Sequence, residues 1–174
     1  MDITKKLNVT KDDIPISTLR EMFFIDDQWC LRNKVTRSNN AKVGNKSGNK
    51  RPDGYIKISI GGKNYRAHRI IWALHYNKWP QKQIDHINGI RDDNRIENLR
   101  EADYSENSMN GSNWSNNKSG IKGVRWREDM NRYVGFVGMN RKQKHVGTFT
   151  NIEDAIEAVR KVREEMHGEF ANFG

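Results

Sequence analysis

Residues 110–120, which read NGSNWSNNKSG, interrupt the chain with a stretch rich in Asn, Ser and Gly. This composition is typical of a flexible linker, because such residues supply neither a stable helix nor an apolar core. A length of 174 residues allows one large domain or two small ones, and only 34% of the residues are apolar while 30% are charged. The sequence therefore predicts two modest domains, residues 1–109 and 121–174, joined by this linker.

The first segment alternates between helical and strand spacing of its apolar residues. In chain order it predicts a helix, a strand, a β-hairpin and a second helix, at residues 16–24, 29–31, 55–67 and 68–78. The second helix ends before Trp79-Pro80, because a residue that precedes proline disfavours helical geometry. Two short strands, at residues 83–86 and 99–101, then enclose an Asn/Asp-rich loop, and a helix that carries Asn107 follows.

The second segment has a different pattern, with strands predicted at residues 122–127, 132–139 and 142–148. Thr150 and Glu153 have the spacing of a capping box that opens a helix. The apolar residues of this helix form one stripe: Ile152, Ala155, Ile156, Val159, Val162 and Met166. The stripe would cover one face of a three-stranded antiparallel sheet, so the chain is expected to belong to the α+β class.

The chain is strongly basic, with a formal charge of +9 and a pI of about 9.7, which favours a polyanionic partner. Residues 32–51 contain seven Lys or Arg residues and no acid, and Asn and Gly fill much of the remainder. This segment is expected to be a mobile loop or arm that follows phosphates. A solvated loop without a partner is the alternative.

Charge is divided within the second domain. Residues 119–148 carry seven bases and two acids, whereas residues 150–174 carry three bases and six acids. The sheet is therefore expected to face a polyanion and the helix to face away from it. Arg125 and Arg127 share one strand face by period two, and arginines on a sheet can read guanine in a DNA major groove. A solvated sheet face is the alternative.

Cys30 is the only cysteine, which excludes an intrachain disulfide and a cysteine-based structural zinc site. No apolar run approaches the length of about 18 residues that a membrane span needs. The first residues, MDITKKLNVTKDD, lack the apolar stretch of a secretory signal. A reducing, cytoplasmic location is therefore expected.

Asp85-His86 is followed at short spacing by Asn94, Asn98 and Asn107. An imidazole with a pKa of about 6.5 is largely neutral in the cell, so His86 is a candidate base for taking a proton from water. The oxygens of Asp85 and Asn107 suit a hard divalent cation, Mg²⁺ or alternatively Mn²⁺. Such a set predicts hydrolysis of a phosphodiester at a site with one metal ion.

Each of these residues has a plainer alternative role. An isolated Asp-His pair is more often a structural contact, and Asn-Gly at positions 88–89 is more often only a turn. Asn94 and Asn98 are able to close the loop by bonding to backbone, and for Asn98 that role is favoured. Neighbouring side chains of a strand also point in opposite directions, so a shared site for Asp85 and His86 requires a twist or bulge before Asn88.

Residues 68–110, read with the upstream Asp53-Gly54-Tyr55, closely resemble HNH endonucleases of phages and mobile introns, the ββα-metal-finger class. By that resemblance Asp85 and Asn107 match the metal ligands and His86 matches the general base. Asn98 matches the residue that supports the catalytic loop. The resemblance implies a ββα-metal nuclease domain with a hairpin N-terminal to it.

Residues 119–173 resemble the plant ethylene-response-factor type of DNA-binding domain, on the matches Gly123-Val-Arg125, Gly147-Thr-Phe149 and His167-Gly-Glu-Phe170-Ala-Asn172. His145 stands where that family commonly places a tryptophan that touches DNA. Phe136 and Gly138 replace its frequent Glu and Arg, so the plant recognition sequence is not expected here. The predicted DNA-binding residues are Arg125, Arg127, Arg132, Arg141, Lys144 and His145.

The sequence thus predicts a metal-dependent endonuclease for double-stranded DNA, in which the C-terminal sheet directs the nuclease domain to its substrate. A monomer that nicks one strand is the simplest expectation, and a dimer is the alternative. If a phage encodes the chain, its location is the cytoplasm of a bacterial host. A non-catalytic DNA-binding regulator that retains the nuclease fold is the alternative function, and a nuclease directed at RNA or at a DNA structure is a third.

Overall fold

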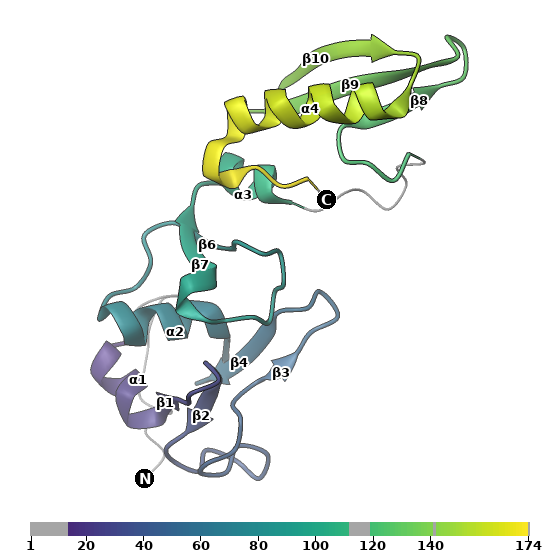
Figure 1. The fold of residues 1–174 in the computed structure, drawn as a ribbon. Coiled ribbons are helices and arrows are strands. Elements are labelled where there is room, and N and C mark those ends of the chain that lie inside the picture. Colours follow the sequence, from purple (N-terminus) through teal and green to yellow (C-terminus); the bar gives the residue numbers. More distant parts are fainter. Residues whose placement is uncertain (1–13, 112–118, 141, 174) are drawn as a thin grey trace. The chain divides into compact units, whose positions relative to one another are not determined.

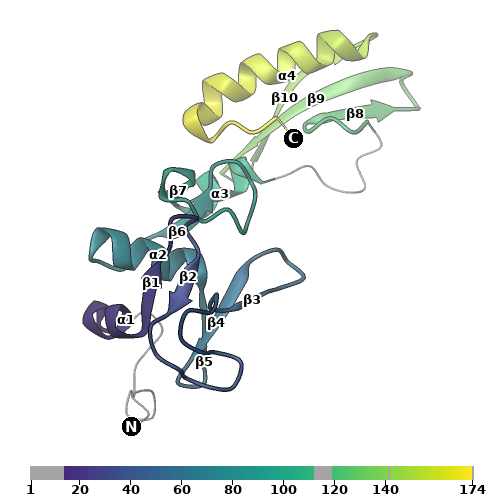
Figure 2. The ribbon, with the colours of Figure 1, turned by 60° about the horizontal axis from the view of Figure 1, so that its bottom comes forward.

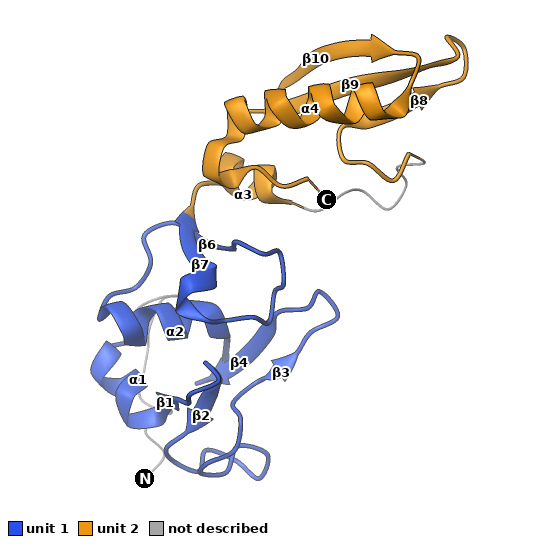
Figure 3. Cartoon of the chain, in the orientation of Figure 1, with its two compact units in different colours: residues 1–101 blue, residues 102–174 orange. Residues whose placement is uncertain are grey.

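A computed structural model describes residues 14–111, 119–140 and 142–173. The chain divides into two compact units, residues 1–101 and residues 102–174 (Figure 3). Helices and small sheets are both present, and the described residues contain four α-helices, in agreement with the predicted mixed class. The described residues include no helix that is long and apolar enough to cross a bilayer.

The first unit opens with α1 (Ile16–Met22), β1 (Phe23–Ile25) and β2 (Leu31–Asn33). The helix was predicted to reach residue 24, and this end was wrong. Phe23 is extended, with φ −136° and ψ 157°, because it pairs with Asn33 in the antiparallel β1–β2 ladder. Tertiary pairing therefore ends the helix two residues early.

A three-stranded antiparallel sheet follows, in the order β3 (Asn49–Lys50), β4 (Ile56–Ile60) and β5 (Lys63–Arg66) (Figures 1 and 2). β4 and β5 form the predicted hairpin. Gly61 and Gly62 turn the chain with φ values of 55° and 79°, which glycine adopts at little cost. The two-residue strand β3 was not predicted.

The basic segment, residues 32–51, is folded onto the first unit and is not the mobile arm that was expected. Arg37 donates hydrogen bonds to the Ser59 carbonyl at 2.9 Å and to the Asn33 Oδ1 at 3.0 Å, and its guanidinium lies 4.7 Å from the centre of the Phe23 ring. Three further bases of the segment are paired with acids, in the pairs Arg32–Asp26, Lys50–Asp92 and Arg51–Asp53. Much of its positive charge is therefore matched within the unit.

α2 (Ala67–Tyr76) packs on this framework, and its end at Asn77, which has φ 55°, is slightly earlier than predicted. Leu19, Phe23, Ile58 and Ile70 are among the buried residues of the main core. β6 (Gln83–His86) and β7 (Leu99–Ala102) form a separate two-stranded sheet, with the 3-10 helix η2 (Ile96–Asn98) leading into β7. A smaller core of Trp72, Ile84 and Leu99 joins α2 to these two strands.

The second unit contains an antiparallel sheet in the order β10 (Lys142–Phe149), β9 (Arg132–Met139), β8 (Val124–Arg127). α4 (Ile152–His167) lies along one face of this sheet (Figures 1 and 2), and the 3-10 helix η3 (Gly168–Phe170) follows it. The core between sheet and helix comprises Val124, Val137, Ala155 and Val159. This is the arrangement that the strand spacing and the apolar stripe predicted.

The predicted N-cap of α4 was wrong. Asn151, and not Thr150, is the N-cap: its Oδ1 accepts hydrogen bonds from the backbone N–H groups of Glu153 and Asp154, at 2.7 and 3.3 Å. Asn is as effective an N-cap as Ser or Thr, so the helix begins one residue later than the capping-box spacing indicates.

α3 (Tyr104–Asn110) belongs to the second unit, although the nuclease domain was predicted to extend through residue 109. Asp103 is its N-cap and forms a capping box with Glu106. A small core of Ala102, Met109 and Phe170 explains why α3 groups with residues that follow it. Most of the predicted linker lies outside the described residues. The predicted ββα arrangement of β6, β7 and α3 stays a prediction.

Candidate functional site

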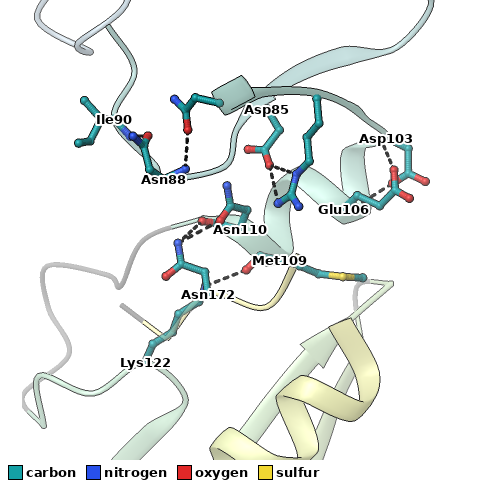
Figure 4. A network of polar contacts seen from close by, with 11 residues as sticks. Asp85, Asn88, Ile90, Asp103, Glu106, Met109, Asn110, Lys122 and Asn172 are labelled. Atoms are coloured by element: carbon teal, nitrogen blue, oxygen red, sulfur yellow. Dashed lines mark hydrogen bonds and ion pairs between the residues drawn. The ribbon is translucent and has the colours of Figure 1, made fainter. Parts of the chain in front are cut away.

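Asp85 lies on β6 with its carboxylate buried, at 5% exposure. Arg100, on the paired strand β7, places its Nε and Nη2 atoms each 2.9 Å from Oδ2 of Asp85 (Figure 4). Both side chains are largely shielded, with 14% exposure for Arg100 and 6% for Asp85, so water screens the pair poorly. The predicted metal ligand is therefore also one half of a buried ion pair.

His86, the next residue, is 3% exposed and has different partners. Its Nε2 lies 3.1 Å from Oδ1 of Asn94, and its ring meets the His68 ring edge-on, with 5.0 Å between centroids. Burial lowers the pKa of His86, while the hydrogen bond to Asn94 and the charge of Asp85 oppose this shift. The imidazole is therefore neutral at pH 7, as a base that accepts a proton from water must be.

His68, in the first turn of α2, packs against the same ring. Burial lowers its pKa from 6.5 to about 3, and the neighbouring His86 acts in the same direction. Tyr55 lies beside both imidazoles, with ring centroids 5.3 Å from His68 and 5.8 Å from His86. One neutral imidazole, that of His68, and the phenol of Tyr55 thus flank the predicted base, and His68 adds no positive charge beside it.

The loop between β6 and β7 is closed by the side chain of Asn98. Its Oδ1 accepts a hydrogen bond from the backbone N–H of Asn88 at 3.0 Å, and its Nδ2 donates to the carbonyl of Asp93 at 2.7 Å. Asn98 is 7% exposed, so water does not replace these bonds easily. These are the contacts of a residue that supports the loop, which is the role that was favoured for it.

Asp93 ties the middle of the same loop together. Its carboxylate accepts hydrogen bonds from Arg95 at 2.9 and 2.8 Å and from Asn88 Nδ2 at 2.7 Å. The hydrogen bonds from Arg95 are the main reason that the pKa of Asp93 falls to about 2. The Asn88-Gly89 turn also forms, with Gly89 N–H donating to the His86 carbonyl at 2.8 Å. The loop that follows the predicted base is therefore held at several points.

Asn107, the second predicted metal ligand, lies on α3 in the second unit, so its convergence with Asp85 stays a prediction. Within that unit the end of α3 is firmly held. Lys122 donates from Nζ to the carbonyl of Met109 at 2.8 Å and also to that of Gly111 (Figure 4). Asn172 Nδ2 donates to the Asn110 carbonyl at 2.8 Å. These bonds satisfy carbonyls that a helix end leaves without internal partners.

The donor chemistry fits a hard divalent cation. The described residues contain no cluster of three or more His, Cys, Asp or Glu side chains that would hold a metal by themselves. The predicted set is smaller, one carboxylate and one carboxamide, and Mg²⁺ is commonly held by one or two carboxylates together with water and substrate phosphates. A carboxylate has about four lone-pair positions, so the bonds from Arg100 to Oδ2 of Asp85 do not exhaust it.

The register of the second unit's sheet separates the predicted DNA-binding residues. Arg125 is paired with Val134 and Arg127 with Arg132, so these three arginines project from the face opposite α4. His145 is paired with Phe136 on that face, and Arg125 lies 5.7 Å from the Phe136 ring. We call Arg125, Arg127, Arg132, Phe136 and His145 the open face.

Two of the predicted DNA-binding residues, Lys144 and Arg141, are not part of the open face. Lys144 is paired with Val137, whose side chain is in the core beneath α4, so Lys144 lies on the helix side of the sheet. The predicted contact of Lys144 with DNA stays a prediction. Arg141 lies outside the described residues. Arg127 is not isolated, because its guanidinium bonds to Asp129 at 2.8 and 2.7 Å.

Sequence reasoning did not identify Arg100 as part of the site. A signal was present, since the predicted strands 83–86 and 99–101 carry an acid and a base that face each other once the strands pair. Asn94 was predicted only to form hydrogen bonds with the backbone. In the structure its Oδ1 lies at hydrogen-bond distance from Nε2 of His86. No periodicity distinguishes that contact from bonding to the backbone.

Residues 65–109 match the family model described as HNH endonuclease, a segment that includes Asp85, His86, Asn94, Asn98 and Asn107. "Protein 3.8" of Escherichia phage T7 is 32% identical to this chain over 109 residues, which cover 62% of this chain and 89% of that protein. No solved structure matches the chain. The family match ends at residue 109, so the resemblance of the C-terminal segment to the ethylene-response-factor domain stays a prediction.

Proposed function

The chain belongs to the HNH endonuclease family, and we propose that it is a metal-dependent endonuclease that hydrolyses phosphodiester bonds in double-stranded DNA. The observation that carries this proposal is the neutral, buried imidazole of His86 directly after the buried carboxylate of Asp85. A site for general-base hydrolysis beside a cation needs these two groups, and it needs the imidazole without its proton.

In this proposal His86 takes a proton from the attacking water, and Asp85 and Asn107 hold one divalent cation, Mg²⁺ or Mn²⁺. When bound, the cation supplies neutralising charge for the phosphate and for the departing 3′ oxygen. Asn98 keeps the loop after His86 closed through its bonds to Asn88 and Asp93. Arg100 keeps the Asp85 carboxylate in one position.

We assign the targeting of DNA to the open face of the second unit. The three arginines of that face are exposed, and arginine on a strand is suited to phosphates and to guanine edges. The aromatic Phe136 between Arg125 and His145 gives the face an apolar centre. The phage relative favours action in the cytoplasm of a bacterial host.

A non-catalytic DNA-binding regulator is the second candidate, and one observation favours it. The guanidinium of Arg100 already neutralises Asp85, as a cation would. A plasmid-nicking assay separates the two candidates. The nuclease proposal expects nicked or linear plasmid with Mg²⁺, none after chelation, and none from the variant His86→Ala, which should bind DNA as the wild type does. Wild-type protein that binds DNA and leaves plasmid intact with either Mg²⁺ or Mn²⁺ would favour the regulator.

A further inference from the structure

The side chain of Asn94 contacts the imidazole of His86, the proposed base. Its Oδ1 lies 3.1 Å from Nε2 of His86, and both residues are buried, at 8% and 3% exposure. An amide oxygen only accepts hydrogen bonds, so Nε2 carries the hydrogen in this contact. A neutral imidazole has a single N–H, and therefore Nδ1 is left as the nitrogen that accepts a proton.

The position of Asn94 is fixed from both sides of the chain. The carbonyl of Asp93, the residue before it, accepts the hydrogen bond from Asn98 Nδ2 at 2.7 Å. The carbonyl of Arg95, the residue after it, accepts from the backbone N–H of Asn98 at 2.9 Å. Asn98 thus fixes the backbone of Asp93 and Arg95, the residues on either side of Asn94. With its backbone held in this way, the Asn94 side chain points toward the imidazole of His86.

The ring itself is confined on its other sides. His68 meets it edge-on at 5.0 Å between centroids, and Tyr55 meets it at 5.8 Å with the ring planes 54° apart. Rotation of the imidazole about its χ2 angle would bring it against these rings and would break the bond to Asn94. The contact therefore sets both the orientation and the tautomer of His86.

We infer that Asn94 is a positioning residue, which holds His86 in the tautomer with hydrogen on Nε2 so that Nδ1 is the proton acceptor. The inference rests on the proposed function for its role in cleavage. In that reaction an O–H bond of water breaks and its proton forms a bond to Nδ1. The oxygen forms the new bond to phosphorus, the bond from phosphorus to the 3′ oxygen breaks, and the 3′ oxygen leaves with the electron pair and takes a proton from solvent. Asn94 Oδ1 keeps its bond to Nε2–H and favours the imidazolium that results.

The tautomer is measured directly, without DNA or metal, by long-range ¹H–¹⁵N spectra of the full-length protein at a pH where His86 is neutral. We expect the wild type to show a protonated Nε2 and an unprotonated Nδ1. Asn94→Leu, which keeps the volume and removes the acceptor, should shift both nitrogens toward a mixture of tautomers. Asn94→Asp keeps an acceptor and should retain the wild-type tautomer. Hydrogen on Nδ1 in the wild type, or an unchanged tautomer in Asn94→Leu, would overturn the inference.

Asn88→Ala is the matched control, since Asn88 bonds to Asp93 and Ile90 in the same loop. It should loosen the loop and leave the His86 tautomer as in the wild type. A tautomer change in Asn88→Ala equal to that in Asn94→Leu would assign the effect to the loop as a whole and overturn the inference. With Mg²⁺ and plasmid, Asn94→Leu should lower the single-turnover rate about 10²-fold at unchanged DNA affinity, and Asn94→Asp by less. A wild type that shows the expected tautomer and cuts nothing would refute the proposed function and leave the tautomer assignment standing.

Discussion

Arg100 places two guanidinium nitrogens 2.9 Å from a single oxygen of Asp85, on the strand beside it. The carboxylate that is proposed to hold a metal thus has a positive partner before any cation arrives. This pairing lets the protein bury Asp85 beside His86 without an uncompensated charge. It also predicts how metal binding and stability depend on each other.

Removal of Arg100 should make the first unit dependent on a cation. Arg100→Leu removes the guanidinium that neutralises the buried Asp85 carboxylate, so we expect the free energy of unfolding in metal-free buffer to fall by about 3 kcal/mol. Added Mg²⁺ should then raise the melting temperature of this variant by more than that of the wild type, because the cation replaces the guanidinium. Urea and thermal unfolding measure both effects.

The double variant Asp85→Asn/Arg100→Leu is the control for that experiment. It has no buried carboxylate, so its melting temperature should not respond to Mg²⁺ above the wild-type response. An equal response of the single and double variants would show that the cation acts elsewhere on the chain.

Closure of the loop should depend on the Asn98 carboxamide. Asn98→Ala leaves the Asn88 N–H and the Asp93 carbonyl without their partner, which should lower the free energy of unfolding by about 2 kcal/mol. The Asn88 amide should also exchange its hydrogen faster. Asn64→Ala, which loses one exposed bond to Ser59, should change stability by no more than about 0.5 kcal/mol. Similar losses in both variants would contradict a special role for Asn98.

Acid should unfold the first unit, and His68 should be a main reason. Its pKa falls from 6.5 in the unfolded chain to about 3 in the folded protein, so between these values the unfolded state binds the proton and the folded state does not. The stability that neutral His68 gives the folded protein is therefore fully present above pH 6.5 and is lost as the pH falls toward about 3. The total loss in the free energy of unfolding is on the order of 4 kcal/mol.

His68→Phe keeps a ring against Tyr55 and removes the titrating group. Urea unfolding at a series of pH values should give a flatter dependence for this variant between pH 6.5 and about 4. A dependence as steep as that of the wild type would assign the acid sensitivity to other groups, of which His86 is the nearest.

The second unit should hold α3 through Lys122. A helix of seven residues is marginal by itself, and Lys122 binds the carbonyls of Met109 and Gly111 at its end. Lys122→Met should therefore lower the free energy of opening of the last turn of α3 by about 1–3 kcal/mol. The backbone amides of that turn should then exchange their hydrogens faster than in the wild type. Lys161→Met, an exposed change on α4, should leave α3 unaffected. Unchanged exchange in Lys122→Met would mean that the apolar contacts of Met109 suffice.

Much of the fold followed from local pattern. Residues 132–139 and 83–86 form strands with the predicted limits, and the stripe of α4 covers its sheet, because each pattern is local and continuous. β3 was missed because its two residues have no apolar alternation and become extended only by pairing with β4. The early end of α1 has the same cause, since Phe23 is paired with Asn33.

The sequence allowed the residues of the site to be predicted, but not the contacts between their side chains. The short spacing of Asp85, His86 and Asn98 places them in one strand and loop, and the structure keeps them there. Which side chain contacts Nε2 of His86 depends on how the loop folds back. That fold depends on the hydrogen bonds of Asn98 to the backbone of Asn88 and Asp93, which lie ten and five residues before it. Such contacts leave no period in the sequence.

DNA binding should distinguish the two faces of the C-terminal sheet. Arg125 projects from the open face, whereas Lys144 is paired with Val137 on the helix side. Arg125→Ala should weaken binding to a duplex and reduce the magnitude of the salt slope by about 1, as expected for the loss of one phosphate contact. Lys144→Ala removes the same formal charge and should change both quantities much less. Fluorescence anisotropy over a series of salt concentrations measures affinity and slope together, and equal effects of the two variants would mean that net charge, and not the open face, binds the DNA.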